Sequence, residues 1–291
     1  MKRIDMSSFG PVYRSPEGKE EIQRKYDEIL KQCPVAYEEL HVNTSYGNTY
    51  VIRSGDHSLP ALLLLHGTSS NSAFMLGEII EYSKHYCVYA IDIPGEPGKS
   101  EERQYSLVHT VYYSWLKELI DQLSLTNVSI LGLSLGGWLI TGFASRYPNY
   151  VEKLVLLCPS GIGKQRVSFI FKAVFYMLQG DRGRDKLAKL VNGNQPIPNE
   201  VKEYTSLIAS QFHLRKEQVP IYPDEELKQL QMPLLLIVGE KDVLLDSNDT
   251  ARRIQRLLPH ARVMLLPDHG HVLIGLQADI LRFLSERSPD Y

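Results

Sequence analysis

The chain has 291 residues, of which 43% are hydrophobic, so it can bury a sizeable core in one large domain or two small ones. Its formal net charge of -2 and pI near 6.5 leave no basic field for nucleic acid or an anionic membrane, and favour small molecules as partners. No apolar run approaches the roughly 20 residues that span a bilayer, and the start of the chain lacks the apolar segment of a signal peptide. We therefore expect a cytoplasmic protein.

The cysteines indicate neither a disulfide framework nor a metal site. Cys33, Cys87 and Cys158 are odd in number and widely spaced, and the last two lie inside apolar, strand-like runs. The sequence contains no C-x-x-C pair and no other metal-ligand spacing among its cysteines. We expect reduced thiols, no bound metal and no cofactor.

The first predicted element is a helix that starts at Ser15, because a serine N-cap is followed there by Pro16 at the first helical position. Two strands are predicted at residues 36–42 and 48–53, around a turn at residues 46–48. Residues 1–35 are therefore assigned to an N-terminal helical extension that packs on the outside of the core.

From residue 61 onwards, continuous apolar strands alternate with amphipathic helices, which is typical of a parallel α/β fold. The helices are predicted at residues 75–84, 107–123, 135–146, 248–257 and 273–284. The strands are predicted at residues 61–65, 87–91, 128–131, 154–157, 234–238 and 262–266. With the first two strands, this pattern predicts a mostly parallel eight-stranded sheet flanked by helices and formed by residues 36–160 and 228–291.

The alternation stops between the sixth and seventh predicted strands, over a stretch that is too long for one crossover. Residues 161–227 are therefore predicted to be a helical insertion. Its segment at residues 167–177 is apolar on nearly every side, and a charged helix at residues 182–191 follows. The apolar segment is either an ordinary buried helix or a lid over a pocket, in which case Phe171 and Phe175 would contact the substrate.

The central motif is Gly132-Leu133-Ser134-Leu135-Gly136, which joins a predicted strand to a predicted helix. A serine at so sharp a turn is held at strained backbone angles, and a glycine two residues away on each side supplies the necessary space. The hydroxyl would then project from the carboxyl edge of the sheet at a helix N-terminus, where backbone N–H groups can bind an oxyanion. The spacing alone is weak evidence, and the alternative is a serine that only caps the helix.

A serine hydroxyl needs a base and a carboxylate to become a nucleophile, and groups at the carboxyl ends of different parallel strands converge. Asp242 follows the penultimate strand and is the preferred acid, with Asp246 and Glu240 as alternatives. His271 follows the last strand and is the preferred base, with His269 as the alternative. The order serine, acid, histidine is the one expected of this topology.

A second loop points to the same edge of the sheet. His66-Gly67 directly follows the strand at residues 61–65, and its glycine would let the backbone approach a substrate. The N–H of Thr68 could then join that of Leu135 in an oxyanion hole. The alternative is a plain strand-to-helix loop.

Together these motifs resemble those of the α/β-hydrolase family, from about residue 36 to the C-terminus, and look closest to bacterial carboxylesterases. The resemblance implies that the insertion after the sixth strand is a lid. One departure is the loop Glu96-Pro97-Gly98-Lys99-Ser100, which is a residue longer than the usual one. The family's motifs stand in this chain as His66-Gly67, Asp92-Ile93-Pro94-Gly95, the Ser134 elbow, Asp242 and Gly270-His271.

These features predict a serine hydrolase that cleaves a small to medium carboxylic ester through an acyl-enzyme intermediate. Ser134 would attack the carbonyl, His271 would take and return the proton, and Asp242 would orient the imidazole. Amide or C–C bond hydrolysis and acyl transfer use the same groups and are the alternatives, together with a non-catalytic ligand-binding member of the fold. The expected partner is a small-molecule ester, and the expected state is a monomer or homodimer.

Overall fold

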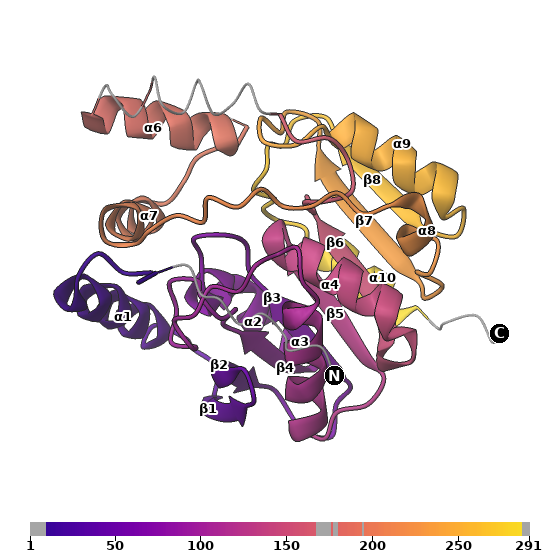
Figure 1. The fold of residues 1–291 in the computed structure, drawn as a ribbon, viewed down its shortest axis with the longest axis horizontal. Coiled ribbons are helices and arrows are strands. Elements are labelled where there is room, and N and C mark those ends of the chain that lie inside the picture. The colour runs from indigo at the N-terminus through magenta and orange to yellow at the C-terminus, as the bar shows by residue number, and fades with distance from the viewer. Residues whose placement is uncertain (1–9, 167–175, 177–179, 194, 287–291) are drawn as a thin grey trace.

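The computed structural model describes residues 10–166, 176, 180–193 and 195–286, and these form a single eight-stranded sheet covered by helices (Figure 1). The strand order is β1-β2-β4-β3-β5-β6-β7-β8. Pairing is antiparallel between β1 and β2 and between β2 and β4, and parallel for every other neighbouring pair. The predicted α/β fold with a mostly parallel sheet is therefore confirmed. The strands are β1 (Tyr37–Thr44), β2 (Gly47–Ser54), β3 (Ala61–Leu65), β4 (Cys87–Ile91), β5 (Val128–Leu133), β6 (Val151–Leu157), β7 (Leu234–Gly239) and β8 (Arg262–Leu266).

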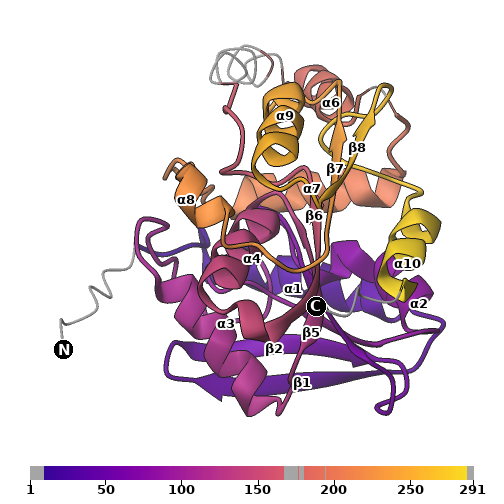
Figure 2. The same cartoon turned by 90° about the vertical axis from the view of Figure 1, so that its right-hand side faces the viewer.

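Helices cover both faces of the sheet, as Figure 2 shows from the side. Successive strand residues point to opposite faces, so Leu63 and Leu65 pack on one side, whereas Leu62 and Leu64 pack on the other. Both faces are buried, which explains why the parallel strands are continuously apolar. One face carries α3 (Val111–Gln122), α4 (Leu135–Arg146), α8 (Asp224–Leu227) and α9 (Ser247–Leu257), and the other carries α1 (Pro16–Leu30), α2 (Leu76–Tyr82) and α10 (Gln277–Ser285). Short 3₁₀ helices lie at Ser72–Met75 and Pro148–Tyr150.

Two predicted helices begin later than the sequence indicated, and the first strands meet at a different turn. α3 begins at Val111 rather than at residue 107, and the N–H of Leu107 donates to the Glu217 carboxylate at 2.8 Å. α10 begins at Gln277 rather than at residue 273, because Gly275 has a left-handed φ of 78°. In the β1–β2 hairpin Thr44 pairs with Gly47, so the turn lies at residues 45–46.

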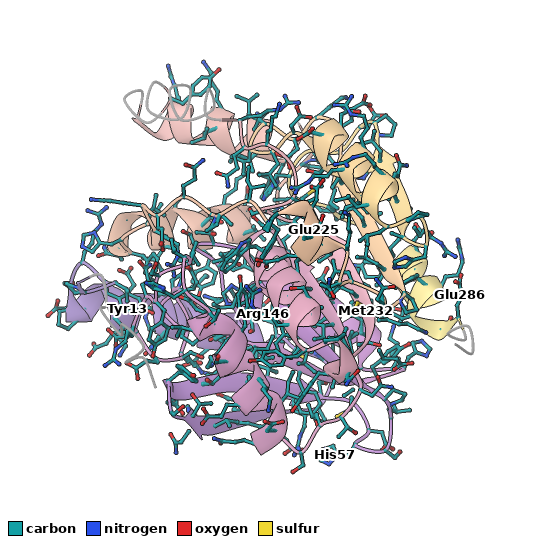
Figure 3. All side chains as sticks on the ribbon, turned by 45° about the vertical axis from the view of Figure 1, so that its right-hand side comes forward. Tyr13, His57, Arg146, Glu225, Met232 and Glu286 are labelled. Atoms are coloured by element: carbon teal, nitrogen blue, oxygen red, sulfur yellow. The ribbon has the colours of Figure 1, made fainter. Side chains whose placement is uncertain are left out.

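The chain between β6 and β7 forms α6 (Gly180–Val191) and α7 (Asn199–Gln211) before it returns to the core at α8. α7 was not predicted, although Tyr204 and Ile208 stand at helical spacing; both are buried against the side of the molecule that carries α1. Tyr13, labelled in Figure 3, forms an isolated bridge with Phe212 just beyond α7. Phe171 and Phe175, with most of the predicted apolar segment, lie outside the described residues.

Within the described residues, every helix is too short or too polar to cross a bilayer.

Candidate active site

Ser134 occupies a sharp turn between β5 and α4. Its φ of 50° and ψ of -107° lie outside the regions that non-glycine residues prefer, a conformation that costs about 1 to 3 kcal/mol. Its N–H donates to the carbonyl of Leu157 at 3.0 Å, and its own carbonyl accepts the N–H groups of Ser160 and Trp138. The Ser134 side chain makes no capping hydrogen bond to α4, so the interpretation of this serine as a helix cap is wrong.

The two glycines of the motif are required by the close approach of three elements. A Cβ atom on Gly132 would lie 2.6 Å from the carbonyl carbon of Gly136, in the first turn of α4. A Cβ atom on Gly136 would lie 2.4 Å from the carbonyl oxygen of Leu65, at the end of β3. Neither position can accept a side chain without moving backbone, which is the physical reason for the G-x-S-x-G spacing.

His271 and Asp242 form a buried, hydrogen-bonded pair. Nδ1 of His271 lies 2.7 Å from Oδ2 of Asp242, and the two residues are 7% and 1% exposed. The other oxygen, Oδ1, accepts the N–H groups of Leu244 at 2.7 Å and Leu245 at 3.0 Å, which fixes the carboxylate. Since an ionised carboxylate can only accept, Nδ1 of the imidazole carries the proton, and Nε2 of the neutral ring is left as an acceptor.

The alternative acid and base lie in other environments. Oδ1 of Asp246 accepts the N–H of Asp249 at 3.0 Å, so this carboxylate caps α9. Glu240 is exposed. Among the residues that the structure describes, Nδ1 of His269 is buried without a hydrogen-bond partner, and His271 is the histidine that contacts Asp242.

Two residues that follow β6 lie beside the candidate catalytic groups. Oγ of Ser160 lies 3.5 Å from Oγ of Ser134. Sγ of Cys158 lies within 4.8 Å of a carboxylate oxygen of Asp242 and of a ring nitrogen of His271. Neither Cys158 nor Ser160 was predicted as a site residue. The signal was their place directly after a strand that is the neighbour of β5 in the sheet.

Among the described residues, the side chains that could together hold a metal ion are those of Cys158, Asp242 and His271. However, Nδ1 of His271 and Oδ2 of Asp242 are already hydrogen-bonded to each other. Burial, followed by the charge of Asp242, raises the pKa of the Cys158 thiol. The sulfur is therefore held as a neutral thiol, a poor metal ligand.

The predicted oxyanion loop lies against the serine. A Cβ atom on Gly67 would lie 3.5 Å from Cβ of Ser134, and Thr68 is the next residue. The neighbouring His66 is buried; its Nδ1 lies 2.8 Å from the carbonyl oxygen of Gly67, and its Nε2 accepts the N–H of Ile93 at 2.9 Å. Burial lowers the pKa of His66, so the ring is neutral and ties this loop to the turn after β4.

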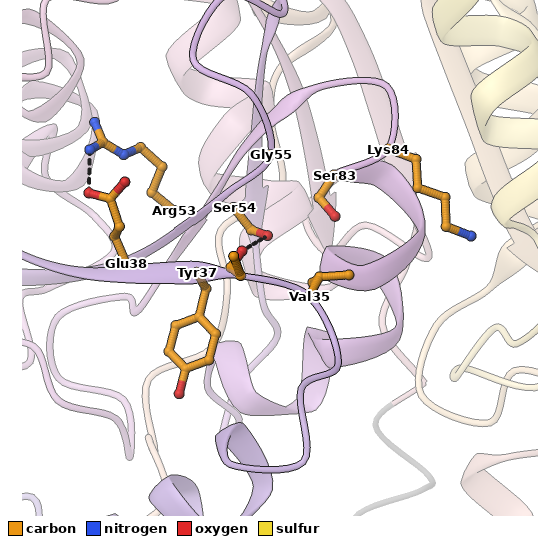
Figure 4. Close-up of a pocket in the computed structure, with 9 residues that line it drawn as sticks. Val35, Tyr37, Glu38, Arg53, Ser54, Gly55, Ser83 and Lys84 are labelled. Atoms are coloured by element: carbon orange, nitrogen blue, oxygen red, sulfur yellow. Dashed lines mark hydrogen bonds and ion pairs between the residues drawn. The ribbon is translucent and has the colours of Figure 1, made fainter.

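A cavity of about 320 Å³ lies elsewhere, and Figure 4 shows its lining. Residues 35–38, 53–55, 83 and 84 line it, from the start of β1, the end of β2 and the turn before β4. These segments lie at the amino edge of the parallel strands, because Ser54 pairs with Val88 near the start of β4. Ser134 follows the opposite, carboxyl edge, so this cavity is not part of the candidate active site.

The fold and this arrangement define an α/β hydrolase: the chain belongs to the alpha/beta hydrolase family, whose model matches residues 62–281. The chain is similar to two proteins of Bacillus subtilis (strain 168). It is 30% identical to the uncharacterized carboxylesterase nap over 85% of each chain, and 28% identical to carboxylesterase YbfK over 85% of this chain and 86% of that one. The resemblance to bacterial carboxylesterases drawn from the motifs is thereby confirmed.

Solved structures agree. The crystal structure of carboxylesterase CesB (YbfK) from Bacillus subtilis has a TM-score of 0.82 at 26% identity, covering 92% of this chain and 99% of that one. The crystal structure of naproxen esterase (carboxylesterase NP) from the same organism has a TM-score of 0.81 at 26% identity, covering 94% and 100%.

Proposed function

We propose that this protein is a serine hydrolase of the carboxylesterase type, with Ser134 as nucleophile, His271 as base and Asp242 as the orienting acid. The observation that carries the proposal is the 2.7 Å hydrogen bond between His271 and Asp242. This buried pair lies near Cys158, two residues before Ser160, which in turn lies 3.5 Å from the Ser134 hydroxyl on its strained turn. The hydrogen bond leaves Nε2 of the imidazole as the proton acceptor that a serine hydroxyl requires. The similarity to proteins named carboxylesterases supports an ester as the substrate.

The proposed reaction has two halves. Oγ of Ser134 attacks the acyl carbonyl while its proton moves to Nε2 of His271, and the N–H groups of Thr68 and Leu135 bind the oxyanion. The tetrahedral intermediate then expels the alcohol, which receives the proton from His271, and the acyl group stays on the serine. Water, which gives a proton to His271, attacks this ester. The second tetrahedral intermediate expels the Ser134 oxygen, which takes that proton back from His271, and the acid is released. The Asp242 carboxylate stabilises the imidazolium in both halves without taking the proton.

The insertion after β6 is the proposed lid, and two of its described segments are bonded to residues of the candidate site or of the helix that follows Ser134. The carbonyl of Val191, at the end of α6, accepts the N–H of His271 at 2.8 Å. On the other side, Nε1 of Trp138, from the helix that follows Ser134, donates to the carbonyl of Pro220 at 3.1 Å. We propose that the segment carrying Phe171 and Phe175 lines a pocket for small to medium acyl or aryl groups.

A panel of p-nitrophenyl esters of increasing acyl length, assayed beside matched anilides, tests the proposal. We expect ester hydrolysis with kcat/KM rising several-fold per added acyl carbon until the pocket is full, since each buried methylene contributes about 0.8 kcal/mol. A fluorophosphonate probe should label Ser134 alone. Anilide cleavage without ester cleavage would indicate an amidase, and the absence of both turnover and labelling would indicate a binding protein.

Variants of the two central residues provide the second arm of this test. Ser134→Ala and His271→Ala should each lower kcat by several orders of magnitude, and the double variant should be little worse, because a nucleophile and its base act as a unit. Additive losses, or clean labelling at another residue, would contradict the assignment.

A further inference from the structure

The longer loop after β4 places a buried carboxylate against the candidate oxyanion loop. The Glu96 side chain has no exposed surface, and its Oε2 accepts the N–H of Ser69 at 2.7 Å. Ser69 has a left-handed φ of 54° although it is not glycine, and it directly follows Thr68. An ionised acceptor makes a shorter and stronger hydrogen bond than a neutral one. The carboxylate therefore stabilises a backbone conformation that Ser69 would not adopt by preference.

The same carboxylate faces a cation from the end of the insertion. Oε1 of Glu96 lies 3.5 Å from Nε of Arg215, whose side chain is only 3% exposed. Within the described residues, neither of these two buried atoms has a hydrogen-bond partner. Burial raises the pKa of Glu96, while the charge of Arg215 acts against that rise. The guanidinium is therefore the neighbouring group that favours the ionised form of this carboxylate.

Arg215 is itself held firmly on the core. Its Nη1 donates to the carbonyl of Tyr105 at 2.8 Å, and its Nη2 donates to Oη of Tyr112 at 2.7 Å. A second carboxylate, that of Glu217, lies 3.6 Å from Nη1, but it bonds to residues 106 and 107 rather than to the Ser69 loop. The segment that carries Arg215 runs from α7 to α8 across the molecule (Figure 1).

We infer that Glu96 is a positioning residue for the oxyanion hole, fixing the Thr68 N–H through Ser69, and that Arg215 connects this loop to the end of the insertion. The inference rests on the proposed function. The peptide group that joins Thr68 to Ser69 is the one that Glu96 holds, so loss of the carboxylate frees this group to rotate and takes the neighbouring Thr68 N–H out of line. An oxyanion exists only in the transition state and in the intermediates that resemble it, so the loss should appear in kcat rather than in KM.

The test compares three substitutions at Glu96 with one at Glu217. Glu96→Ala removes the acceptor, and we expect kcat for the best p-nitrophenyl ester to fall about 100-fold with KM nearly unchanged, as for the loss of one oxyanion donor. Glu96→Asp is one methylene too short and should show the same loss. Glu96→Gln keeps an oxygen that can accept the Ser69 N–H and should retain kcat within about fivefold. Glu217→Ala, which removes the other carboxylate beside Arg215, should behave like the wild type.

The affinity for an aryl trifluoromethyl ketone distinguishes a misplaced oxyanion-hole N–H from a general structural defect of the variant. Its adduct with the serine carries an oxyanion, so its Ki for Glu96→Ala should rise in proportion to the fall in kcat/KM, whereas a purely structural defect would lower the active fraction without changing Ki. A wild-type kcat in both the Glu96→Ala and Glu96→Asp variants, or an unchanged Ki together with a lowered kcat, would overturn the inference.

If Glu96→Ala does not fold, the Asp and Gln variants decide the same question. An inactive, unlabelled wild type would overturn the proposed function as well, whereas an active wild type with unaffected Glu96 variants would overturn this inference alone.

Discussion

The substitution Asp242→Asn tests the proposed mechanism at its most specific point, because it changes one oxygen into an NH₂ group in a fully bonded position. Oδ1 of Asp242 accepts two backbone N–H groups, from Leu244 and Leu245, and Oδ2 faces Nδ1 of His271. The amide oxygen of asparagine should take the Oδ1 position, since the flipped amide would lose both of these hydrogen bonds. At about 1 kcal/mol for each, the flip costs about 2 kcal/mol, a factor of about 30.

The amide NH₂ therefore faces Nδ1 of His271 and requires an acceptor there. The imidazole must then carry its proton on Nε2, where it can no longer take the proton of Ser134. We expect kcat to fall about ten-thousandfold, the loss typical of a histidine held in the wrong tautomer. The melting temperature should change by only a few degrees, because the bonds of Oδ1 to Leu244 and Leu245 remain.

Initial rates on the best p-nitrophenyl ester and a thermal melt by circular dichroism measure both quantities. Asp246→Asn is the matched control: it makes the same chemical change four residues away, where asparagine caps α9 about as well as aspartate. Its kcat should lie within about twofold of the wild type. A folded Asp242→Asn protein that keeps more than about a tenth of its kcat, or an impaired Asp246→Asn protein, would refute the tautomer argument.

Three further outcomes are expected. His269→Gln should keep most of the activity, so an inactive variant would show that the wrong histidine was assigned. Cys158 should resist iodoacetamide at pH 8 until the protein is unfolded, since burial raises its pKa and the thiolate is the reactive form. Rapid alkylation of Cys158 in the native protein, detected by mass spectrometry, would contradict this. Because burial lowers the pKa of His66 in the folded state, its contribution to stability is present above its unfolded pKa of about 6.5 and is lost as the pH falls below it, at up to about 1.4 kcal/mol per pH unit. Urea unfolding from pH 7 to 5 should show the advantage of the wild type over His66→Gln shrinking with falling pH, and parallel curves would contradict this.

The nature of the fold followed from local patterns in the sequence. Continuous apolar runs bounded by turn residues predicted the strands, and three of them, β3, β4 and β8, have the predicted limits. The G-x-S-x-G spacing predicted the elbow, because a glycine requirement imposed by close backbone approach is visible in the residue types themselves. The choice of Asp242 and His271 came from their places after the last two strands, which a parallel sheet brings to one edge.

Other features were decided only by tertiary structure, since they depend on contacts between segments that are distant in the chain. The segment before α3 is held by Glu217, 110 residues away, whose carboxylate accepts the N–H of Leu107. Ser160 and Cys158 join the site because β6 lies beside β5 and β7, and nothing in their own neighbourhood distinguishes them from other residues at strand ends. Glu96 appeared in the sequence only as part of an unusually long loop. Glu96 lies against the candidate oxyanion loop because β4 is the neighbour of β3 in the sheet. It faces Arg215 because the chain that returns from the insertion passes beside it, and periodicity and spacing carry no information about such a contact.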